Sequence, residues 1–380
     1  MISLFKRYPL LAEKLPHVSL GVLPTPIQKL DRLANEIGAD TLYLKRDDLS
    51  GAIYGGNKIR VLGFLLGRAL QIGAREVLTF GYAGSTHATA TAVYAKELGL
   101  KSISMLLPQP NARYVRANLL LSYACGAELH QHRSVRALYP ATAYQLLRHR
   151  LRCGRFPYRI APGGSSPLGT IGYVDAAFEL ADQVKEGKIP QPDCIYVPLG
   201  SMGTAVGLTL GLRAVGVETR VVPVRVIGEA HASAEGMVRL FGKTNALLRS
   251  LDGSFPAFEI TENDLDIRHD FLGQGYALFT EAGMRAVACM ELSEGMTLDG
   301  TYTGKALAAL IQDAKKDALK DKTVLFWNTY NSRDFSDAIA GVDYRQLPRC
   351  FHPYFEQDVQ PLDRPHRPAG QGQMPATVRL

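Results

Sequence analysis

Short runs rich in β-branched and aliphatic residues alternate along this chain with longer amphipathic stretches. The pattern predicts strands over residues 41–45, 76–81, 102–107, 158–161, 195–199, 220–227 and 323–327. It predicts a helix following residue 203, and others over residues 58–73, 85–98, 112–125, 168–186, 232–251, 280–292 and 304–320. Strands separated by helices are typical of a parallel sheet with helices on both faces. We therefore expect an α/β protein.

Composition narrows the class of protein and its compartment. The 380 residues allow two domains, and 46% hydrophobic with 21% charged residues is typical of a soluble protein. No apolar run approaches the roughly 18 residues that cross a bilayer, and the first residues lack the apolar core of a signal peptide. The five cysteines are odd in number and form no CxxC pair, which indicates neither a disulfide framework nor a zinc site. We expect a cytoplasmic protein with no membrane partner and no metal.

The net charge of +7 is modest and suits an anionic cofactor and an anionic substrate. The densest basic stretch, residues 148–159, lacks a nucleic-acid-binding motif and interleaved stacking aromatics. It is interpreted as a solvated helix end followed by a loop. We therefore expect no nucleic-acid partner.

Three turns follow predicted strands, and in open parallel sheets ligands bind beyond the carboxyl ends of the strands. The first turn, SGAIYGGNKIR, places Asn57 and Lys58 at the start of a helix. The positive end of the helix dipole disfavours an ammonium there, and burial would lower the pKa further. A neutral amine is the nucleophile that forms a Schiff base. The alternative is an ordinary surface lysine.

The second turn, FGYAGSTHA, starts a helix with Ser85, Thr86 and His87. Free backbone N–H groups and hydroxyls at such a position suit a carboxylate or a phosphate. The alternative is that Ser85 or Thr86 only caps the helix.

The third turn joins a buried strand to a helix through Gly200, Ser201, Met202, Gly203 and Thr204. Its N–H groups and two hydroxyls form a phosphate cradle. It lacks the lysine of a GxxxxGK[ST] loop, does not match GxGxxG and has no acidic ribose partner, so it indicates neither ATP nor a dinucleotide. The alternative is a plain strand-to-helix turn. An amine, an anion site and a phosphate cradle at one sheet edge together predict a pyridoxal 5'-phosphate (PLP) site.

The sequence resembles the tryptophan-synthase-β-like PLP enzymes, in the branch of D-cysteine desulfhydrase and 1-aminocyclopropane-1-carboxylate deaminase. The resemblance runs from about Leu23 to about Thr329 and includes LYLKRDDL, GGNKIR, PGGSSPLGTIGYVDAAFEL, GSMGTAVGL and LDGTYTGKA. It implies two α/β domains with open twisted sheets, an active site between them, and a homodimer. We place the smaller domain at residues 59–167 and the larger, PLP-binding domain at 1–58 plus 168–350. Residues 361–380, rich in Pro, Gly and polar residues, are expected to form a poorly ordered tail.

The resemblance also assigns roles to individual residues. Lys58 matches the Schiff-base lysine, and Asn57 is part of the same motif. Ser85 matches the serine that binds the substrate carboxylate or assists catalysis, with His87 nearby. Tyr276 and Tyr302 match two tyrosines close to the substrate, where a phenol can transfer a proton. The cradle over residues 200–204 matches the phosphate site.

Several positions depart from the branch. Thr86 replaces an Asn expected near the phenolic oxygen of the cofactor, and it donates only one hydrogen bond. Thr303 stands where the deaminases have a glutamate and the desulfhydrases a threonine, and a hydroxyl cannot give the pyridine nitrogen a charge. Residues 328–331 read NTYN instead of HTGG, with Thr329 still expected to reach that nitrogen. These departures leave the substrate open.

We therefore predict a PLP-dependent lyase or deaminase acting on a small amino acid. The preferred reaction is a D-cysteine desulfhydrase-like α,β-elimination that yields a keto acid, ammonia and the leaving group, because the neutral Thr303 favours a good β leaving group. Cyclopropane ring opening by a deaminase, another β-elimination and β-replacement are alternatives at the same site. A non-catalytic PLP-binding protein is the alternative from a different class.

Overall fold

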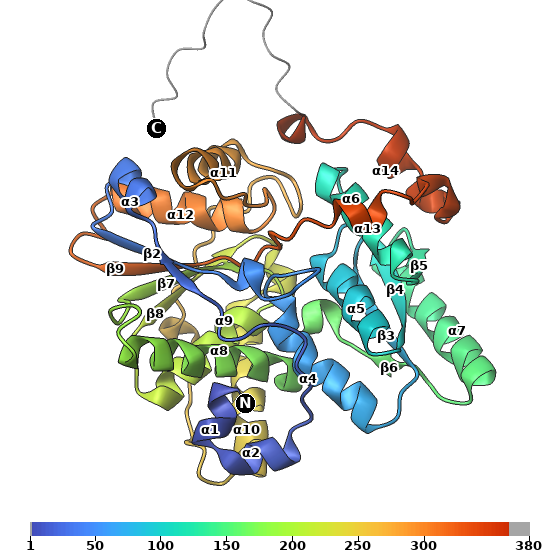
Figure 1. The fold of residues 1–380 in the computed structure, drawn as a ribbon, viewed down its shortest axis with the longest axis horizontal. Coiled ribbons are helices and arrows are strands. Elements are labelled where there is room, and N and C mark those ends of the chain that lie inside the picture. Colours follow the sequence, from blue (N-terminus) through green and yellow to red (C-terminus); the bar gives the residue numbers. More distant parts are fainter. Residues whose placement is uncertain (1, 365–380) are drawn as a thin grey trace, which may run out of the picture.

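Two sheets form the framework of the protein, and the computed structural model describes residues 2–364 (Figure 1). The five-stranded sheet has the order β1-β2-β9-β7-β8 and the four-stranded sheet the order β5-β4-β3-β6. All neighbouring strands are parallel except β1 and β2. The strands are β1 Ile27–Lys29, β2 Thr41–Lys45, β3 Glu76–Tyr82, β4 Lys101–Leu107, β5 Glu128–Gln131, β6 Tyr158–Arg159, β7 Cys194–Leu199, β8 Arg220–Arg225 and β9 Thr323–Trp327.

Helices cover both sheets. In the first half of the chain they are α1 Ser3–Arg7, α2 Pro9–Lys14, α3 Asp31–Ile37, α4 Lys58–Gln71, α5 Thr86–Glu97, α6 Arg113–Ala124, α7 Val135–Cys153 and α8 Pro167–Lys185. In the second half they are α9 Gly203–Val215, α10 Ala234–Leu251, α11 Glu281–Glu294, α12 Thr303–Lys315, α13 Ser336–Ile339 and α14 Pro353–Glu356. No helix among residues 2–364 is long and apolar enough to cross a membrane.

The central strand β7 shows why the larger sheet is covered on both faces. All six of its residues are buried, as in a continuous apolar run that faces helices on either side. Ile195, Val197 and Leu199 pack with α8, α9 and α10, whereas Cys194 and Tyr196 pack with α3, α11 and α12. Each predicted strand and helix is present, and the predicted α/β fold is confirmed.

The predicted boundaries between the domains remain a prediction, although every strand of the four-stranded sheet falls between residues 59 and 167. The expected tail is wrong at its first residues. Pro361–Asp363 form a 3-10 turn, and the buried Asp363 accepts hydrogen bonds from the backbone N–H and the guanidinium of Arg113. These hydrogen bonds hold residues 361–363 in place despite the polar composition from which the tail was predicted. Residues 365–380 of the expected tail lie outside the described residues.

A close contact between two helices sets the position of α9. A Cβ on Gly207 would come within 2.5 Å of the Cβ of Tyr173 in α8, so the axes approach only because this residue has no side chain. The first residue of α9, Gly203, belongs to the predicted phosphate cradle. The packing of α8 on α9 therefore fixes where that turn lies.

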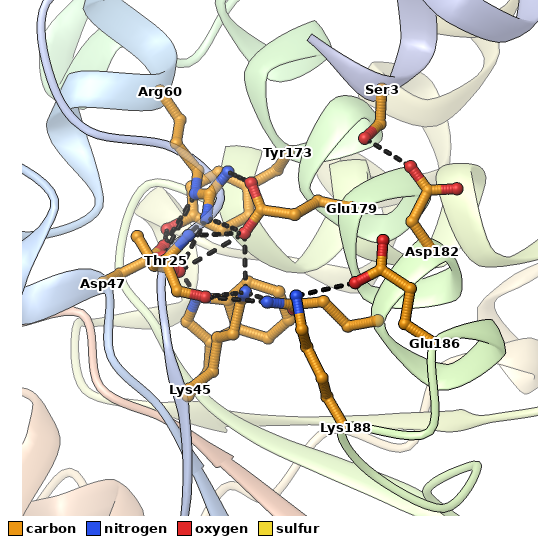
Figure 2. A network of polar contacts seen from close by, with 12 residues as sticks. Ser3, Thr25, Lys45, Asp47, Arg60, Tyr173, Glu179, Asp182, Glu186 and Lys188 are labelled. Atoms are coloured by element: carbon orange, nitrogen blue, oxygen red, sulfur yellow. Dashed lines mark hydrogen bonds and ion pairs between the residues drawn. The ribbon is translucent and has the colours of Figure 1, made fainter.

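A buried ion network joins β2, α4 and α8 (Figure 2). Arg60 donates to Asp47 at 2.8 Å and binds both carboxylate oxygens of Glu179 at 2.8 and 2.9 Å. Lys45 donates to Glu179 at 2.6 Å. These four side chains are almost wholly buried. Bidentate arginine–carboxylate pairs of this kind are geometrically specific.

Neutral donors complete the network. The hydroxyl of Tyr173 and the indole N–H of Trp327 donate to Asp47 Oδ2 at 2.6 and 2.7 Å. Burial alone would raise the pKa of Glu179, but Arg60 and Lys45 lower it to about 2. Burial lowers the pKa of Lys45 to about 8 against the opposing effect of Glu179. Each buried charge therefore depends on its partners.

We predict that Arg60→Met destabilises the protein by about 3–5 kcal/mol, because it leaves two carboxylates buried without their cation. The matched control is Arg239→Met, since Arg239 is exposed and pairs only with Glu235 on the surface of α10. That control should cost less than about 1 kcal/mol. Thermal and urea unfolding measure both. Equal effects of the two substitutions would contradict the assignment.

Candidate active site

One cavity of about 340 Å³ is lined by the turns after β3, β6, β7 and β9 and by the start of α4. These strand ends come from both sheets, so the cavity lies between them, where parallel sheets bind ligands. Twelve of the predicted site residues line it: Asn57, Lys58, Ser85, Thr86, His87, Gly200, Ser201, Met202, Thr204, Tyr276, Tyr302 and Thr329.

Lys58 provides the reactive amine of this cavity. It is the first residue of α4, and its Nζ donates to the carbonyl oxygen of Gly163 at 3.2 Å. Burial lowers its pKa from the ordinary 10.5 to about 8. Burial also lowers the pKa of Lys45 and Lys305 to about 8, where the Lys45 amine binds Glu179 and the Lys305 amine, like that of Lys58, donates to a backbone carbonyl. Neither lines the cavity, so only geometry distinguishes Lys58.

The cradle turn has the geometry of an anion site. Met202 has φ +71°, a left-handed conformation that is uncommon outside glycine. The N–H of Gly203 donates to the carbonyl of Ser201 at 2.9 Å and to the hydroxyl of Ser165 at 3.2 Å. The next N–H groups of the first turn of α9 have no partner within the helix and carry its positive dipole end. Gly203 itself does not line the cavity, although residues on both sides of it do.

Asn57 connects the cradle to the reactive lysine. Its Nδ2 donates to the hydroxyl of Thr204 at 3.2 Å, and its backbone N–H donates to the carbonyl of Thr329 at 3.2 Å. The hydroxyl of Thr204 accepts this bond, so its own proton is free for an anion in the cradle. The start of α4, the start of α9 and the end of β9 are thus held in one arrangement.

The turn after β3 places two further residues on the cavity wall. Ser85 caps α5, with its Oγ accepting from the backbone N–H of Ala88 at 3.2 Å. Ser85 is therefore a helix cap that also lines the cavity, and its binding of a substrate carboxylate stays a prediction. His87 Nε2 bonds the Thr79 hydroxyl at 3.0 Å, while its buried Nδ1 has no partner among residues 2–364. Burial, and then Lys58, hold the pKa of His87 well below its usual range, so the ring is neutral.

Phenols form another side of the cavity. The hydroxyls of Tyr276 and Tyr302 lie 2.5 Å apart and share a hydrogen bond. The ring of Tyr82 packs on Tyr276 with centroids 4.5 Å apart. Burial raises the pKa of Tyr276 and of Tyr302 well above the usual range, so both are protonated at neutral pH. A Cβ on Gly200 would lie 3.3 Å from the Tyr302 ring, which places this pair beside the cradle.

Thr303 does not line the cavity. Its buried hydroxyl donates to the carboxylate of Asp299 at 2.7 Å and accepts from the backbone N–H of Asp299 at 3.0 Å. The carboxylate also accepts the N–H groups of Thr301, Tyr302 and Thr303, so it organises the start of α12. Asp299 lines the cavity and holds the backbone of Tyr302, a role that the sequence reasoning missed although it lies in the LDGTYTGKA motif.

The departures at residues 328–331 have different consequences. Thr329 and Tyr330 line the cavity, whereas Asn328 and Asn331 do not. Asn331 accepts the N–H of Gly55 at 2.6 Å and so supports the loop before Lys58. Tyr82, Tyr330 and Gly163 are among the other lining residues that the site prediction left out. At Gly163, φ is +64° and a Cβ would overlap the Ser201 hydroxyl, so the close approach requires glycine.

The residues present fit PLP. A cofactor that carries both an aldehyde and a phosphate needs one neutral amine and one anion site in the same cavity. Lys58 would provide the amine, and the first turn of α9 with Ser201 and Thr204 would provide the anion site. The unpartnered Nδ1 of His87 leaves a polar position on the wall open to a ligand.

Comparison with known proteins supports the same conclusion. The profile of the family described as "Pyridoxal-phosphate dependent enzyme" matches residues 18–329. The chain belongs to this family. It is a PLP-dependent enzyme of the lyase class, and PLP is its cofactor.

Two named relatives cover most of the chain. A Pyrococcus horikoshii protein, provisionally named a 1-aminocyclopropane-1-carboxylate deaminase, is 38% identical over 336 residues, 85% of this chain and 94% of its own. The D-cysteine desulfhydrase of Salmonella schwarzengrund is 33% identical over 322 residues, 83% of this chain and 94% of its own. The predicted branch of PLP enzymes is therefore confirmed.

Solved structures agree with the fold. A crystal structure of an ACC deaminase homologue superposes with a TM-score of 0.71 at 35% identity and covers 85% of this chain and 94% of its own. The O-acetylserine sulfhydrylase isoform 3 of Entamoeba histolytica gives a TM-score of 0.56 at 15% identity, covering 86% and 91%. The second likeness concerns the fold alone.

The pKa of Lys58 predicts how the apoenzyme takes up PLP. The neutral amine is the reactive form, and its fraction rises as the pH passes the pKa of about 8. The rate of covalent PLP capture should therefore increase from pH 6 to about pH 8 and level off above it. Stopped-flow absorbance of the bound cofactor across this range measures the rate. A rate that keeps rising tenfold per pH unit to about pH 10 would indicate an ordinary lysine.

The phosphate cradle predicts an effect on the affinity for PLP. Thr204→Val removes a hydroxyl placed to donate to the phosphate and should raise the Kd for PLP about tenfold. The matched control is Thr209→Val on the same helix, where the hydroxyl donates only to the carbonyl of Ala205. Equilibrium dialysis of PLP against both apoproteins measures the difference. Equal Kd values for the two variants would contradict the assignment of the cradle.

Proposed function

We propose that the protein catalyses a D-cysteine desulfhydrase-like α,β-elimination on a small amino acid, which releases a keto acid, ammonia and the β substituent. This choice rests on Asp299, the only carboxylic acid among the described residues that line the cavity. Asp299 already accepts four hydrogen bonds from the start of α12. Among residues 2–364, no free carboxyl group therefore lines the cavity that would hold a charge on the ring nitrogen of bound PLP.

That electrostatic feature bears on the type of reaction. Bound PLP withdraws electron density from the Cα of the amino acid joined to it, and it does so less strongly when its ring nitrogen is uncharged. A weaker electron sink favours substrates with a good β leaving group, such as a thiol. It disfavours the opening of a cyclopropane ring, which has no such leaving group.

The residues of the chain divide the remaining work. The amine of Lys58, neutral in half of the molecules near pH 8, removes the proton from Cα. Ser85 and the first turn of α5 hold the substrate carboxylate. The phenols of Tyr276 and Tyr302 share one hydrogen bond, so one proton of the pair is available to the departing group.

A second candidate is 1-aminocyclopropane-1-carboxylate deamination. It is favoured by the identity of 38% to the Pyrococcus horikoshii relative and by the TM-score of 0.71 with the deaminase homologue. Both activities would use the same cavity and the same lysine. Another β-elimination or a β-replacement would also use them, whereas a non-catalytic PLP-binding protein would not need the phenol pair.

The compartment and the assembly belong to the same proposal. We place the enzyme in the cytoplasm, because all five cysteines are free, as in a reducing compartment. We also propose a homodimer, as the family resemblance implies. Light scattering on the eluting peak of a size-exclusion column tests the dimer.

Keto-acid release across a panel of substrates tests the reaction. The panel contains D- and L-cysteine, D- and L-serine, β-chloroalanine and 1-aminocyclopropane-1-carboxylate. We expect D-cysteine and β-chloroalanine to have the highest kcat/KM. Turnover of the cyclopropane substrate alone would replace the proposal by the deaminase, and PLP binding without any turnover would support the non-catalytic alternative.

The phenol pair predicts a specific defect. Tyr302→Phe removes the hydroxyl that shares a proton with Tyr276 and should lower kcat by about 10²–10⁴, with PLP still bound. The control is Tyr344→Phe, because the hydroxyl of Tyr344 makes one long bond of 3.5 Å to Glu356 and lies outside the cavity. Steady-state kinetics and the visible spectrum are measured together. An unchanged kcat in Tyr302→Phe would remove the pair from the mechanism.

A further inference from the structure

The outward face of α7 carries an unusual set of exposed apolar side chains. Leu151, Tyr139 and Tyr144 are 78%, 73% and 64% exposed, and Leu147 is also largely exposed. Tyr144, Leu147 and Leu151 follow one another at spacings of three and four residues, so they form one ridge along the helix. Phe156 continues the exposed apolar surface just beyond the helix end. We call these five side chains the α7 ridge.

Arginines surround the α7 ridge. Residues 129–174 contain seven arginines and not one aspartate, glutamate or lysine. Arg136 and Arg150 lie on one side of the ridge and Arg152 on the other, as the helical spacing places them. Of the seven, only Arg148 forms an ion pair in the part of the chain that the structure describes. The other six are exposed and have no carboxylate partner among residues 2–364, although Arg150 and Arg155 also donate to backbone carbonyls.

The opposite face of α7 holds the helix in place. Leu138, Ala141 and Leu146 pack on Leu78, Ile103 and Met105 of the four-stranded sheet. Buried His149 bonds Glu76 at the start of β3 at 2.9 Å. The α7 ridge is therefore a fixed surface on a helix about 28 Å long at the rim of the molecule (Figure 1). No α7 residue lines the active-site cavity.

We propose that the α7 ridge binds the surface of an anionic phospholipid membrane. Exposed aromatic and aliphatic side chains beside arginines provide the two groups that a membrane-binding surface needs, because apolar residues can enter the headgroup region while guanidinium groups meet lipid phosphates. Such binding is peripheral and needs no spanning segment. It goes beyond the proposed function, because it uses a different face of the molecule. The sequence-based expectation of no membrane partner rested only on the lack of a spanning run.

Charge and shape favour a membrane over two other occupants. In a symmetric dimer through this face the patch would meet itself, and Arg136, Arg150 and Arg152 would face like charges. Nucleic acid would pair with the arginines but would bury the aliphatic side chains of Leu147 and Leu151 against phosphates, at a cost in desolvation. A bilayer interface offers both anionic groups and an apolar layer.

Co-sedimentation of the holoenzyme with vesicles tests the proposal. One set of vesicles contains phosphatidylglycerol and phosphatidylcholine in equal parts, and the other contains phosphatidylcholine alone. We expect binding to the first set, weakened by salt, and none to the second. The triple variant Arg136→Gln, Arg150→Gln, Arg152→Gln should bind about a hundredfold more weakly, at about fivefold for each arginine. Leu147→Ser with Leu151→Ser should bind at least tenfold more weakly.

Matched controls separate this face from the rest of the surface. Leu292→Ser changes an apolar residue that is 82% exposed on α11, and Arg239→Gln changes an exposed arginine on α10. Both should bind vesicles like the parent protein, and all variants should keep the parent keto-acid activity and thermal unfolding. The proposal is overturned by no binding, by equal binding to both vesicle sets, by equal loss in the controls, or by binding to RNA but not to vesicles.

Discussion

The buried network of Lys45, Asp47, Arg60 and Glu179 is the interaction on which the rest of the site depends. Arg60 lies two residues after Lys58 in the first turn of α4, and it joins that turn to the end of β2 and to α8. Four charges that are almost wholly buried are tolerated only when each has its partners. A fixed Arg60 therefore fixes the helix start that presents the Lys58 amine to the cavity.

The active site is built from turns that follow the carboxyl ends of parallel strands. The first turns of α4, α5 and α9 hold the amine, the proposed carboxylate site and the proposed phosphate cradle, and each turn follows a parallel strand. Asn57 bonds Thr204 and the carbonyl of Thr329, so these separate segments share hydrogen bonds. Burial shifts the two pKa values in opposite directions. It lowers the pKa of Lys58, so the amine is partly neutral, and it raises the pKa of Tyr302, so the phenol stays protonated.

Local sequence patterns predicted the features whose geometry depends on residues close together in the chain. Lys58, Ser85 and the cradle could be recognised because strand-to-helix turns are short and rich in Gly and Ser. Only the end of α7 was anticipated, within residues 148–159, because the inner face of the helix buries the polar Thr142, Gln145 and His149 while its outer face carries leucines, which removes the apolar periodicity. The sequence predicted that Thr303 contacts the cofactor, but its hydroxyl donates to the carboxylate of Asp299 at the start of α12. The stacking of Tyr82 on Tyr276 joins residues far apart in sequence, so no local pattern could show it.

The central claim is that PLP is held by Lys58 because of where the amine lies and not because of its pKa alone. Borohydride reduction of the holoenzyme, followed by peptide mass spectrometry, measures this directly. The account predicts one modified peptide, carrying the cofactor on Lys58. Lys45 and Lys305 have pKa values lowered to about the same 8. Modification of either of them in place of Lys58 would contradict the account.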